Sequence, residues 1–518
     1  MAFWTDDILA AADLSRAHVL NDSKTPSGRV HVGALRGVLI HDAIRRVLAD
    51  RGVEATFCYG VDDFDPLDEL PAGLEDIYRP YLGQPLCNVP APPGSGATDV
   101  AEHYIGEFFD VFADLHVVAE PYRMRDIYRS GRFDDAIDRI LRHGDDVRDI
   151  YLRVSGSERP PGWLPFQVVC PVCAKVGTTV VTDYDGETVA FHCRPDLVTW
   201  AQGCGSSGRA SPFSGGGKLP WKLEWTAKWA VLGVTIEGAG KDHTSRGGSR
   251  DVAVACLDRI FGLQPPLNVP YEWFLVGGAK MSSSKGVGVS AREVADLLPA
   301  DVLRFLLMRT RPRSTVDFEP TEDAIVKLFS DFDKCRAEAA RDPAGTFGKI
   351  YRLATDDAPN YWAPPMALVI ALEQLPHVDV DAKVEALKGS ALSPDERAHV
   401  ADRRRVARHW LDRFAGPEEK LELNADLPPG LENLTSGQAR FLADLATRLE
   451  EVAWNAEAVQ DAIFTTARDD EVEPRAAFEA IYLVFFGRRS GPRAGSVLSF
   501  LEPEFVRSRL LAAAACRA

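Results

Sequence analysis

Residues 17–61 constrain the fold most strongly, because they alternate between strand and helix patterns. "AHVLND" at 17–22 is a short apolar strand, and "EATFCYGVDD" at 54–63 is a second one. Between them, residues 34–52 carry apolar side chains at helical spacing and end at a glycine. Two strands joined through a helix form a parallel pair, so the sequence predicts an α/β fold. Ligands of such sheets bind at the carboxyl ends of strands, where the turn-rich loop 23–33 lies.

The rest of the chain divides by composition. Residues 83–99 are rich in Pro and Gly, and residues 155–218 add four clustered cysteines, so the latter segment is predicted to be an insertion. Apolar segments resume over 219–310 and predict the second half of the sheet. Beyond about residue 320 no strand pattern is clear, and we predict a helical domain. Its clearest helical face carries Phe441, Leu442, Leu445, Leu449 and Val452.

Charge limits how this chain of 518 residues can bind a polyanion. The formal net charge of −17 at pH 7 excludes nucleic-acid binding through bulk positive charge. Local basic runs at 403–410 and 487–493 remain candidates, although each alone is typical of a solvated helix face or loop. No apolar run approaches the roughly 18 residues of a membrane span, and no secretion signal is visible at the N-terminus. We therefore expect a cytoplasmic protein.

The loop "TPSGRVHVGALRG" at 25–37 is a candidate phosphate-binding turn. Pro26 and Gly28 shape a turn that exposes backbone N–H groups near a helix N-terminus, a geometry that favours bound anions. His31 lies in the same turn and can donate a hydrogen bond to a phosphate oxygen. Taken alone, the pattern is weak, because a Pro-Ser-Gly turn with a neighbouring histidine is usually structural.

A second candidate is the stretch "GGAKMSSSKGVGVS" at 277–290. Lys280 and Lys285 flank three consecutive serines, and the glycines around them allow close approach to a ligand. Hydroxyl, amide and ammonium groups on such a loop suit negative charge that develops in a transition state. On its own the stretch is more typical of a flexible Gly/Ser linker with incidental lysines.

Four of the nine cysteines have metal-ligand spacing. Cys170 and Cys173 form a CxxC pair, and Cys193 and Cys204 follow as a wider pair. Four thiolates suit tetrahedral zinc, whereas a disulfide is disfavoured in a cytosolic chain. His192 is a possible substitute for Cys193, and four reduced structural cysteines are the simpler alternative. Because four protein ligands leave no open position, we predict a structural site.

Together these motifs resemble those of the class I aminoacyl-tRNA synthetases. "HVGA" at 31–34 is similar to the His-Ile-Gly-His signature of that family, and "KMSSS" at 280–284 is similar to its Lys-Met-Ser-Lys-Ser signature. "NDSKTPSGRVHVG", "VDDFDP", "GAGKDHTSRGGS", "MSSSKG" and "GRRSGPRAG" further resemble the class I, archaeal-type lysyl-tRNA synthetases. The resemblance extends over nearly the whole chain.

The resemblance implies a domain plan and an activity. A Rossmann-type catalytic domain is expected over 1–320, with an insertion at about 80–218 that contains a zinc module at 165–210. An α-helical anticodon-binding domain is expected over 321–518. The implied enzyme is a lysine–tRNA ligase that uses ATP, Mg²⁺ and structural Zn²⁺, binds L-lysine and lysine tRNA, and acts as a monomer. Activation proceeds through lysyl-adenylate, with no covalent enzyme intermediate.

The chain departs from the class pattern at three places. Ala34 stands where the first signature often has a second histidine or a polar residue, so one phosphate or ribose contact is in doubt. Ser283 replaces the second lysine of the other signature, as is usual in the lysyl lineage, where Lys285 can supply the charge. Residues 88–103 are not expected to hold the additional metal of some relatives.

Site residues follow from the resemblance and from position in the motifs. Aromatic side chains, with Trp225 among them, are candidates for holding the lysine stem, partly by cation–π attraction. The implied catalytic residues are His31, Lys280, Ser282, Ser283, Ser284 and Lys285. The implied ATP contacts are Pro26, Ser27, Gly28, His31, Gly33, Gly240, Lys241, Asp242, His243 and Met281. The implied amino-acid contacts are Ser23, Thr25, Asp62, Trp221, His243 and Tyr271.

Two other functions remain open at this point. One is a paralogue that activates an amino acid for a biosynthetic pathway without charging tRNA. The other is a synthetase-like binding protein with degraded catalysis. Intact motifs at both phosphate loops argue against decay, and the late "GPR" segment argues against loss of tRNA.

Overall fold

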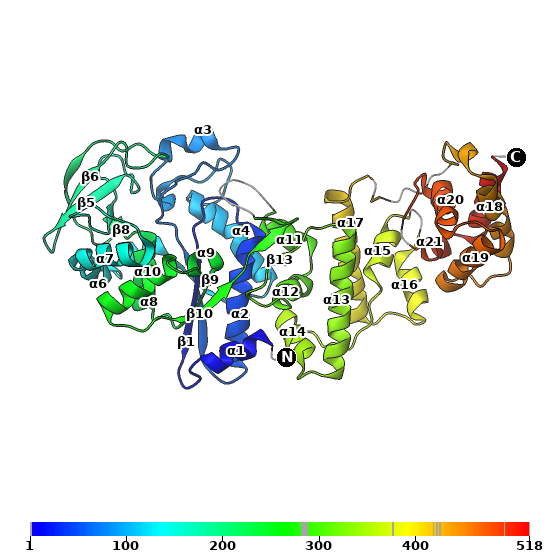
Figure 1. Ribbon diagram of the computed structural model, residues 1–518, viewed down its shortest axis with the longest axis horizontal. Helices are drawn as coiled ribbons and strands as arrows, with labels where there is room; N and C mark the ends of the chain where they lie inside the picture. The colour runs from blue at the N-terminus through cyan, green and yellow to red at the C-terminus, as the bar shows by residue number, and fades with distance from the viewer. Residues whose placement is uncertain are drawn as a thin grey trace. The chain divides into compact units, whose positions relative to one another are not determined.

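The computed structural model describes residues 3–280, 289–375, 378–417, 419–420, 423, 426–491 and 493–516. The chain forms two compact units (Figure 1). The first comprises residues 1–319 together with 343–356, and the second comprises residues 320–342 and 357–518. Within the described residues, no helix combines the length and apolar character needed to cross a lipid bilayer.

The first unit is built on a five-stranded parallel sheet in the order β10-β9-β1-β2-β3. The predicted α/β class is therefore confirmed. Strand β1 lies between β2 and β9, so the chain leaves β1 on one side and later returns on the other. The crevice at such a reversal of strand order is where doubly wound sheets bind ligands. The strands are β1 His18–Lys24, β2 Ala55–Val61, β3 Glu120–Arg123, β9 Ile236–Gly240 and β10 Leu267–Tyr271.

Helix α2 (Leu35–Ala49) connects β1 to β2 and packs against β1, β2 and β9 (Figure 1). Most of its apolar side chains are buried, as the helical spacing predicted, although Val47 is half-buried. Two charged residues of α2, Asp42 and Arg36, are also buried. Both contact helix α12 (Ala300–Met308), and Arg36 also contacts the segment that follows it. Asp42 forms a 2.6 Å ion pair with Arg304, and the Arg36 guanidinium donates to the carbonyl oxygens of Leu307 and Arg311. These contacts fix α2, and thus the turn before it, against α12.

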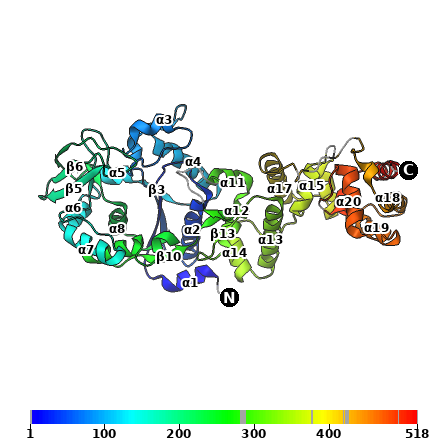
Figure 2. The ribbon, with the colours of Figure 1, turned by 45° about the horizontal axis from the view of Figure 1, so that its top comes forward.

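The segment between β2 and β9 combines helices with a small antiparallel sheet. This segment also contains β3, which is the edge strand of the main parallel sheet. Residues 120–123 therefore do not belong to the insertion, although they lie inside its expected range of 80–218. The three strands β5, β6 and β7 lie beside helices α6 and α7 in both views (Figures 1 and 2). Strands β4 and β8 pair at the root of this module. The elements are α3 Glu75–Tyr78, α4 Val100–Asp114, α5 Met124–Arg129, α6 Asp134–Arg142, α7 Gly144–Ser155, β4 Gln167–Val168, β5 Thr179–Tyr184, β6 Val189–Cys193, β7 Ser207–Ala210 and β8 Gly217–Lys218.

The remaining elements of the first unit flank the main sheet. Helices α8 and α10 pack against each other, and a second small sheet has the strand order β12-β11-β13. The elements are α1 Trp4–Ala11, α8 Trp221–Leu232, α10 Ser249–Cys256, β11 Phe274–Val276, β12 Ala279–Lys280, α11 Ala291–Leu297, β13 Val316–Asp317 and α14 Thr346–Ala354.

The second unit is helical throughout its described residues, as predicted. Of the expected apolar face, Phe441, Leu442, Leu445 and Leu449 are buried, but Val452 lies beyond the end of the helix. The Asn455 side chain accepts a hydrogen bond from the Ala458 N–H and thereby starts a separate helix. The helices are α13 Glu322–Arg341, α15 Met366–Glu373, α16 Val380–Lys388, α17 Pro394–Arg413, α18 Ser436–Arg448, α19 Ala456–Asp469, α20 Pro474–Phe486, α21 Ala494–Phe500 and α22 Pro503–Ala515.

The basic run 403–410 lies on α17, and much of its charge is used within the unit. Arg403 is buried and forms a 2.5 Å ion pair with Asp333. Arg404 and Arg408 both bind Glu373, at 2.5 and 2.6 Å. This run therefore stabilises helix packing and leaves little free charge for a polyanion.

Candidate active site

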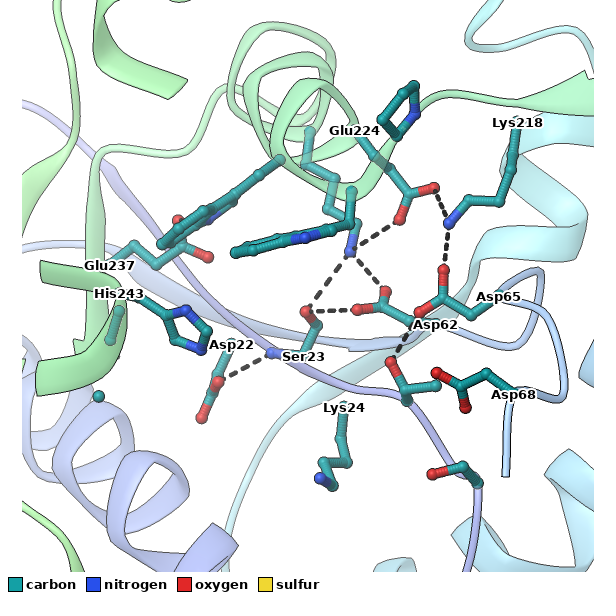
Figure 3. Close-up of a pocket in the computed structure, with 18 of the residues that line it drawn as sticks. Asp22, Ser23, Lys24, Asp62, Asp65, Asp68, Lys218, Glu224, Glu237 and His243 are labelled. Carbon is teal, nitrogen blue, oxygen red and sulfur yellow. Dashed lines mark hydrogen bonds and ion pairs between the residues drawn. The ribbon is translucent and has the colours of Figure 1, made fainter. Parts of the chain in front are cut away.

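A cavity of about 680 Å³ opens at the carboxyl ends of β1, β2, β9 and β10 (Figure 3). Its position is the one expected from the reversal of strand order. Polar and aromatic side chains from these strand ends, the adjoining loops, β8 and α8 line it. The lining residues are Asp22, Ser23, Lys24, Thr25, Ser27, Asp62, Asp65, Pro66, Asp68, Glu69, Gln167, Lys218, Pro220, Trp221, Glu224, Trp225, Lys228, Glu237, Gly238, Ala239, Gly240, His243 and Tyr271.

The cavity brings together every residue that the sequence assigned to the amino acid. Ser23 and Thr25 lie at the end of β1, and Asp62 directly follows β2. Trp221 lies at the start of α8, His243 in helix α9 (Lys241–Thr244) and Tyr271 at the end of β10. Of the residues assigned to ATP, the cavity includes Ser27, Gly240 and His243. Its lining does not include Pro26, Gly28, His31, Gly33, Lys241 or Asp242.

The first signature contacts residues that follow the second one in sequence. The first turn runs into a short 3₁₀ helix, Val32–Ala34, for which His31 is the N-cap. His31 forms an antiparallel bridge with Ser290, and the Val32 N–H donates to the Val289 carbonyl at 3.1 Å. Val289 and Ser290, which follow the second signature in sequence, therefore contact the first. Met281, Ser282, Ser283, Ser284 and Lys285 lie outside the described residues, and Lys280 is the last residue of β12.

Two carboxylates at the floor of the cavity were missed by the sequence analysis. Asp22 precedes Ser23 on β1, and Glu237 lies on the neighbouring strand β9. Burial raises the pKa of Asp22 to about 8, and the nearby charges of Glu237 and Asp62 raise it further. The hydrogen bond from the Ser23 N–H opposes this rise. Burial also raises the pKa of Glu237. Both groups are acids that a bound cation would favour in their ionised form.

Neutral donors hold the Glu237 carboxylate in place. Asn21 donates to Oε1 at 2.6 Å, and the Trp225 indole donates to Oε2 at 2.6 Å. The Trp229 indole donates to Oε2 as well. Because none of these donors carries charge, the negative charge of Glu237 stays uncompensated within this group.

Aromatic rings form one wall of the cavity. Trp221 and Trp225 are stacked, with centroids 6.0 Å apart and planes inclined by 25°. His243 meets Trp221 edge-on at 5.3 Å. Such a wall suits an aliphatic chain that ends in a cation.

A chain of buried ions crosses the cavity behind the strand ends (Figure 3). Lys228 of α8 binds Asp62 at 2.5 Å and Glu224 at 3.6 Å. Lys218 of β8 binds Glu224 at 3.3 Å and also pairs with Asp65. Asp65 in turn accepts a hydrogen bond from Thr25 at 2.7 Å.

Comparison with known proteins places this site in a family. Residues 5–355 match the family model described as "tRNA synthetases class I (K)", and residues 419–514 match the model of an anticodon-binding domain.

The chain belongs to the class I (K) tRNA synthetases.

Curated relatives agree over nearly the full length. A protein named lysine–tRNA ligase from Methanosarcina barkeri is 32% identical over 97% of this chain and 96% of its own. Proteins with the same name from Archaeoglobus fulgidus and Thermoplasma acidophilum are each 31% identical over 98% of this chain, covering 99% and 98% of their own. The resemblance inferred from the motifs is therefore confirmed.

In this synthetase, the Gly-Lys-Asp-His stretch is held by residues beyond β10. Lys241 forms a 2.6 Å ion pair with Glu272 and lies 4.0 Å from the centroid of the Trp273 ring. The Trp273 indole donates to Asp242 at 2.6 Å. These contacts orient the stretch at the edge of the cavity.

The four predicted cysteine sulfurs of the synthetase converge on one point. All four lie within 4.8 Å of one another, with Cys170 and Cys204 3.6 Å apart and Cys173 and Cys193 3.7 Å apart. A tetrahedral site with Zn–S bonds of about 2.3 Å requires sulfur separations of roughly 3.8 Å. The donor set therefore fits zinc. His192 is exposed and is not part of this group.

The segment 88–103 of the synthetase contains three groups of ligand type that have other partners. Glu102 accepts a hydrogen bond from the Thr98 N–H at 2.9 Å. Asp99 caps α4 and binds Arg125 at 2.5 Å, whereas His103 forms a 3.0 Å hydrogen bond with Ser95. These contacts stabilise the loop before α4.

Proposed function

We infer that this chain is a lysine–tRNA ligase, which activates L-lysine with ATP and transfers the lysyl group to the 3′ end of lysine tRNA. The observation that carries this inference is the charge of the cavity. Seven carboxylates line it against three lysines, within a site that belongs to the class I (K) synthetases. A substrate with two ammonium groups suits this excess of negative charge.

The two ammonium groups of lysine are assigned to opposite ends of the cavity. Asp62 and Ser23, whose side chains are 3.0 Å apart, are proposed to receive the α-ammonium. Asp22 and Glu237 are proposed to receive the ε-ammonium, because both side chains are largely buried and neither forms an ion pair with a lysine or arginine among the described residues. Between them, Trp221, His243 and Tyr271 are proposed to contact the aliphatic stem, with Trp225 and Thr25 completing the wall.

Nucleotide is proposed to bind beside this cavity. The turn with Pro26, Ser27, Gly28 and Gly33 offers backbone N–H groups, and His31 is proposed to donate to a phosphate oxygen. Gly240, Lys241, Asp242 and His243 are proposed to contact the nucleoside, with Met281 adjoining them. Lys280, Ser282, Ser283, Ser284 and Lys285 are proposed to stabilise the departing pyrophosphate.

Positioning and charge stabilisation are enough for the first step. The lysine carboxylate attacks the α-phosphorus of ATP in line, and pyrophosphate leaves with the Mg²⁺ that enters with ATP. No residue of the chain forms a covalent bond with the substrate. The ribose hydroxyl of tRNA then attacks the adenylate.

The cysteine module and the second unit are proposed to support this reaction. Cys170, Cys173, Cys193 and Cys204 would hold Zn²⁺, which closes the module on itself without an open coordination position. The second unit is proposed to bind the anticodon through stacked bases. A cytoplasmic monomer is the expected form of the enzyme.

The test is pyrophosphate exchange with each amino acid in turn, with and without tRNA, followed by charging of lysine tRNA. We expect exchange that depends on lysine and charging that depends on lysine tRNA. Equal exchange with glutamate or cysteine would overturn the assignment.

A further inference from the structure

The ion chain Asp62–Lys228–Glu224–Lys218–Asp65 contains three carboxylates but only two ammonium groups. We propose that this ion chain lacks one positive charge and that the α-ammonium of the amino acid supplies it at Asp62. Glu224 and Lys218 are then positioning residues, because their charges leave Asp62 without a full cation of its own. We call this missing charge at Asp62 the vacancy. The inference deepens the proposed function and rests on it, since it concerns how the same site binds lysine.

Burial makes the charge imbalance significant. The side chains of Lys218, Glu224 and Lys228 are 2%, 4% and 4% exposed, so water contributes little to balancing their charges. In such surroundings charges must be compensated by neighbouring groups. Burial opposes the charge of Lys218, but Asp65 and Glu224 outweigh it and leave the pKa of Lys218 raised. Burial raises the pKa of Glu224 despite both lysines, as expected for a carboxylate in a group with too little positive charge.

The geometry places the vacancy at Asp62. Both oxygens of Glu224 are engaged, Oε1 by Lys228 and Oε2 by Lys218 and by the Tyr128 hydroxyl at 2.7 Å. Asp65 is engaged by Lys218 and Thr25. Among the described residues, Asp62 forms an ion pair with one cation, Lys228, which it shares with Glu224.

Lys24 does not fill the vacancy. It lines the same cavity and the charges of Asp22 and Asp62 act on it, but in Figure 3 its ammonium group points away from the ion chain, and no ion pair joins it to another described residue. The proposal therefore assigns the completing positive charge to the substrate.

Glu224 is the best position for a test, because its charge belongs to the ion chain although its carboxylate does not contact Asp62. Glu224→Gln keeps the shape and can still accept from Tyr128, but it leaves two carboxylates against two lysines. The proposal then requires that the α-ammonium lose its electrostatic advantage while the rest of the lysine site is unchanged. A structural role alone would instead lower stability and weaken every ligand.

The experiment compares L-lysine with 6-aminohexanoic acid, which is lysine without its α-amino group. Binding of both ligands is measured by calorimetry for wild type, Glu224→Gln and Asp65→Asn, with Asp258→Asn, an exposed aspartate outside the cavity, as the control. We expect both variants to weaken L-lysine by about tenfold or more and 6-aminohexanoic acid by less than about twofold. The melting temperature should not fall in Glu224→Gln, and the control should bind both ligands as wild type does.

Asp65→Asn removes one negative charge at the end of the ion chain opposite Asp62. It therefore tests the proposal independently if Glu224→Gln fails to fold. Equal weakening of both ligands in the variants, or no weakening of L-lysine, would overturn the inference. A wild-type protein that does not prefer L-lysine to other amino acids would instead overturn the proposed function, so the two failures are distinguishable.

Discussion

Replacing Asp22 with asparagine should make the first unit more stable while impairing its site. Burial raises the pKa of Asp22 to about 8, so the folded protein keeps this side chain protonated under conditions in which the unfolded chain ionises it. A raised carboxyl pKa destabilises the fold progressively as pH rises from the unfolded value of about 3.9 towards 8. Asparagine has the same shape and never ionises, and its side-chain oxygen can still accept the hydrogen bond from the Ser23 N–H, which measures 2.8 Å.

The size of this effect follows from linkage. Each pH unit between these two pKa values costs the wild type about 1.4 kcal/mol of unfolding free energy. At pH 5 the cost is about 1.5 kcal/mol and at pH 7 about 4 kcal/mol, and both values are upper bounds because the side chain is 15% exposed. The advantage of Asp22→Asn should therefore grow by roughly 2 to 3 kcal/mol between pH 5 and pH 7.

Urea unfolding of both proteins at pH 5, 6 and 7 measures this difference, since the midpoint shifts with stability at constant slope. Asp258→Asn, an exposed aspartate outside the cavity, is the control and should show no such trend. The same substitution should raise the KM for lysine, because the proposed ε-ammonium contact loses its charge. An advantage that is independent of pH, or a variant less stable than wild type at pH 7, would refute the reasoning.

Three further predictions concern the signature loop, the cysteines and tRNA. Lys285→Ala should slow single-turnover lysyl-adenylate formation at saturating ATP on the order of 10²-fold, with Lys280→Ala milder, and a change within about twofold would favour a linker. Metal analysis should find about one zinc per chain, and Cys170→Ser should destabilise the module more than it slows adenylate formation. Phe464 is 47% exposed on α19, within the region that matches an anticodon-binding domain, and we expect it to stack on an RNA base. Phe464→Ala should raise the KM for tRNA about tenfold and leave that for ATP unchanged, unlike the exposed aliphatic control Leu511→Ala.

The sequence predicted the parts of the fold that depend on local pattern. The strand and helix periodicity of residues 17–61 sufficed for β1, α2 and β2, because their buried faces are continuous in sequence. The convergence of the four cysteines followed from ligand spacing. The contribution of β3 to the main sheet was not visible, because its four residues are exposed or half-buried and carry no strand alternation.

The acidic part of the site could not be predicted for a different reason. Glu237 lies 216 positions from Asn21, yet the two side chains are hydrogen-bonded. Lys218 similarly meets Asp65 across 153 positions. No local spacing signals such pairs, since parallel strands and an insertion bring them together only in the folded chain. The stretch "NDSKTPSG" did contain a signal at Asp22 and Lys24, two charged residues at the end of an apolar strand.

The arrangement of charge in the first unit separates two substrates of opposite sign. The cavity floor and the ion chain are acidic and would repel a triphosphate, but the lining does not include His31, Lys241 or the backbone of the first signature turn. We expect those groups to bind the nucleotide; His31 also forms a bridge with Ser290, which follows the second signature in sequence. An amino acid with two ammonium groups lowers the negative charge of the cavity when it enters. We therefore expect the carboxylate that attacks the α-phosphorus to be held where the acidic and phosphate-binding regions meet, with the reactive end of lysine beside the nucleotide.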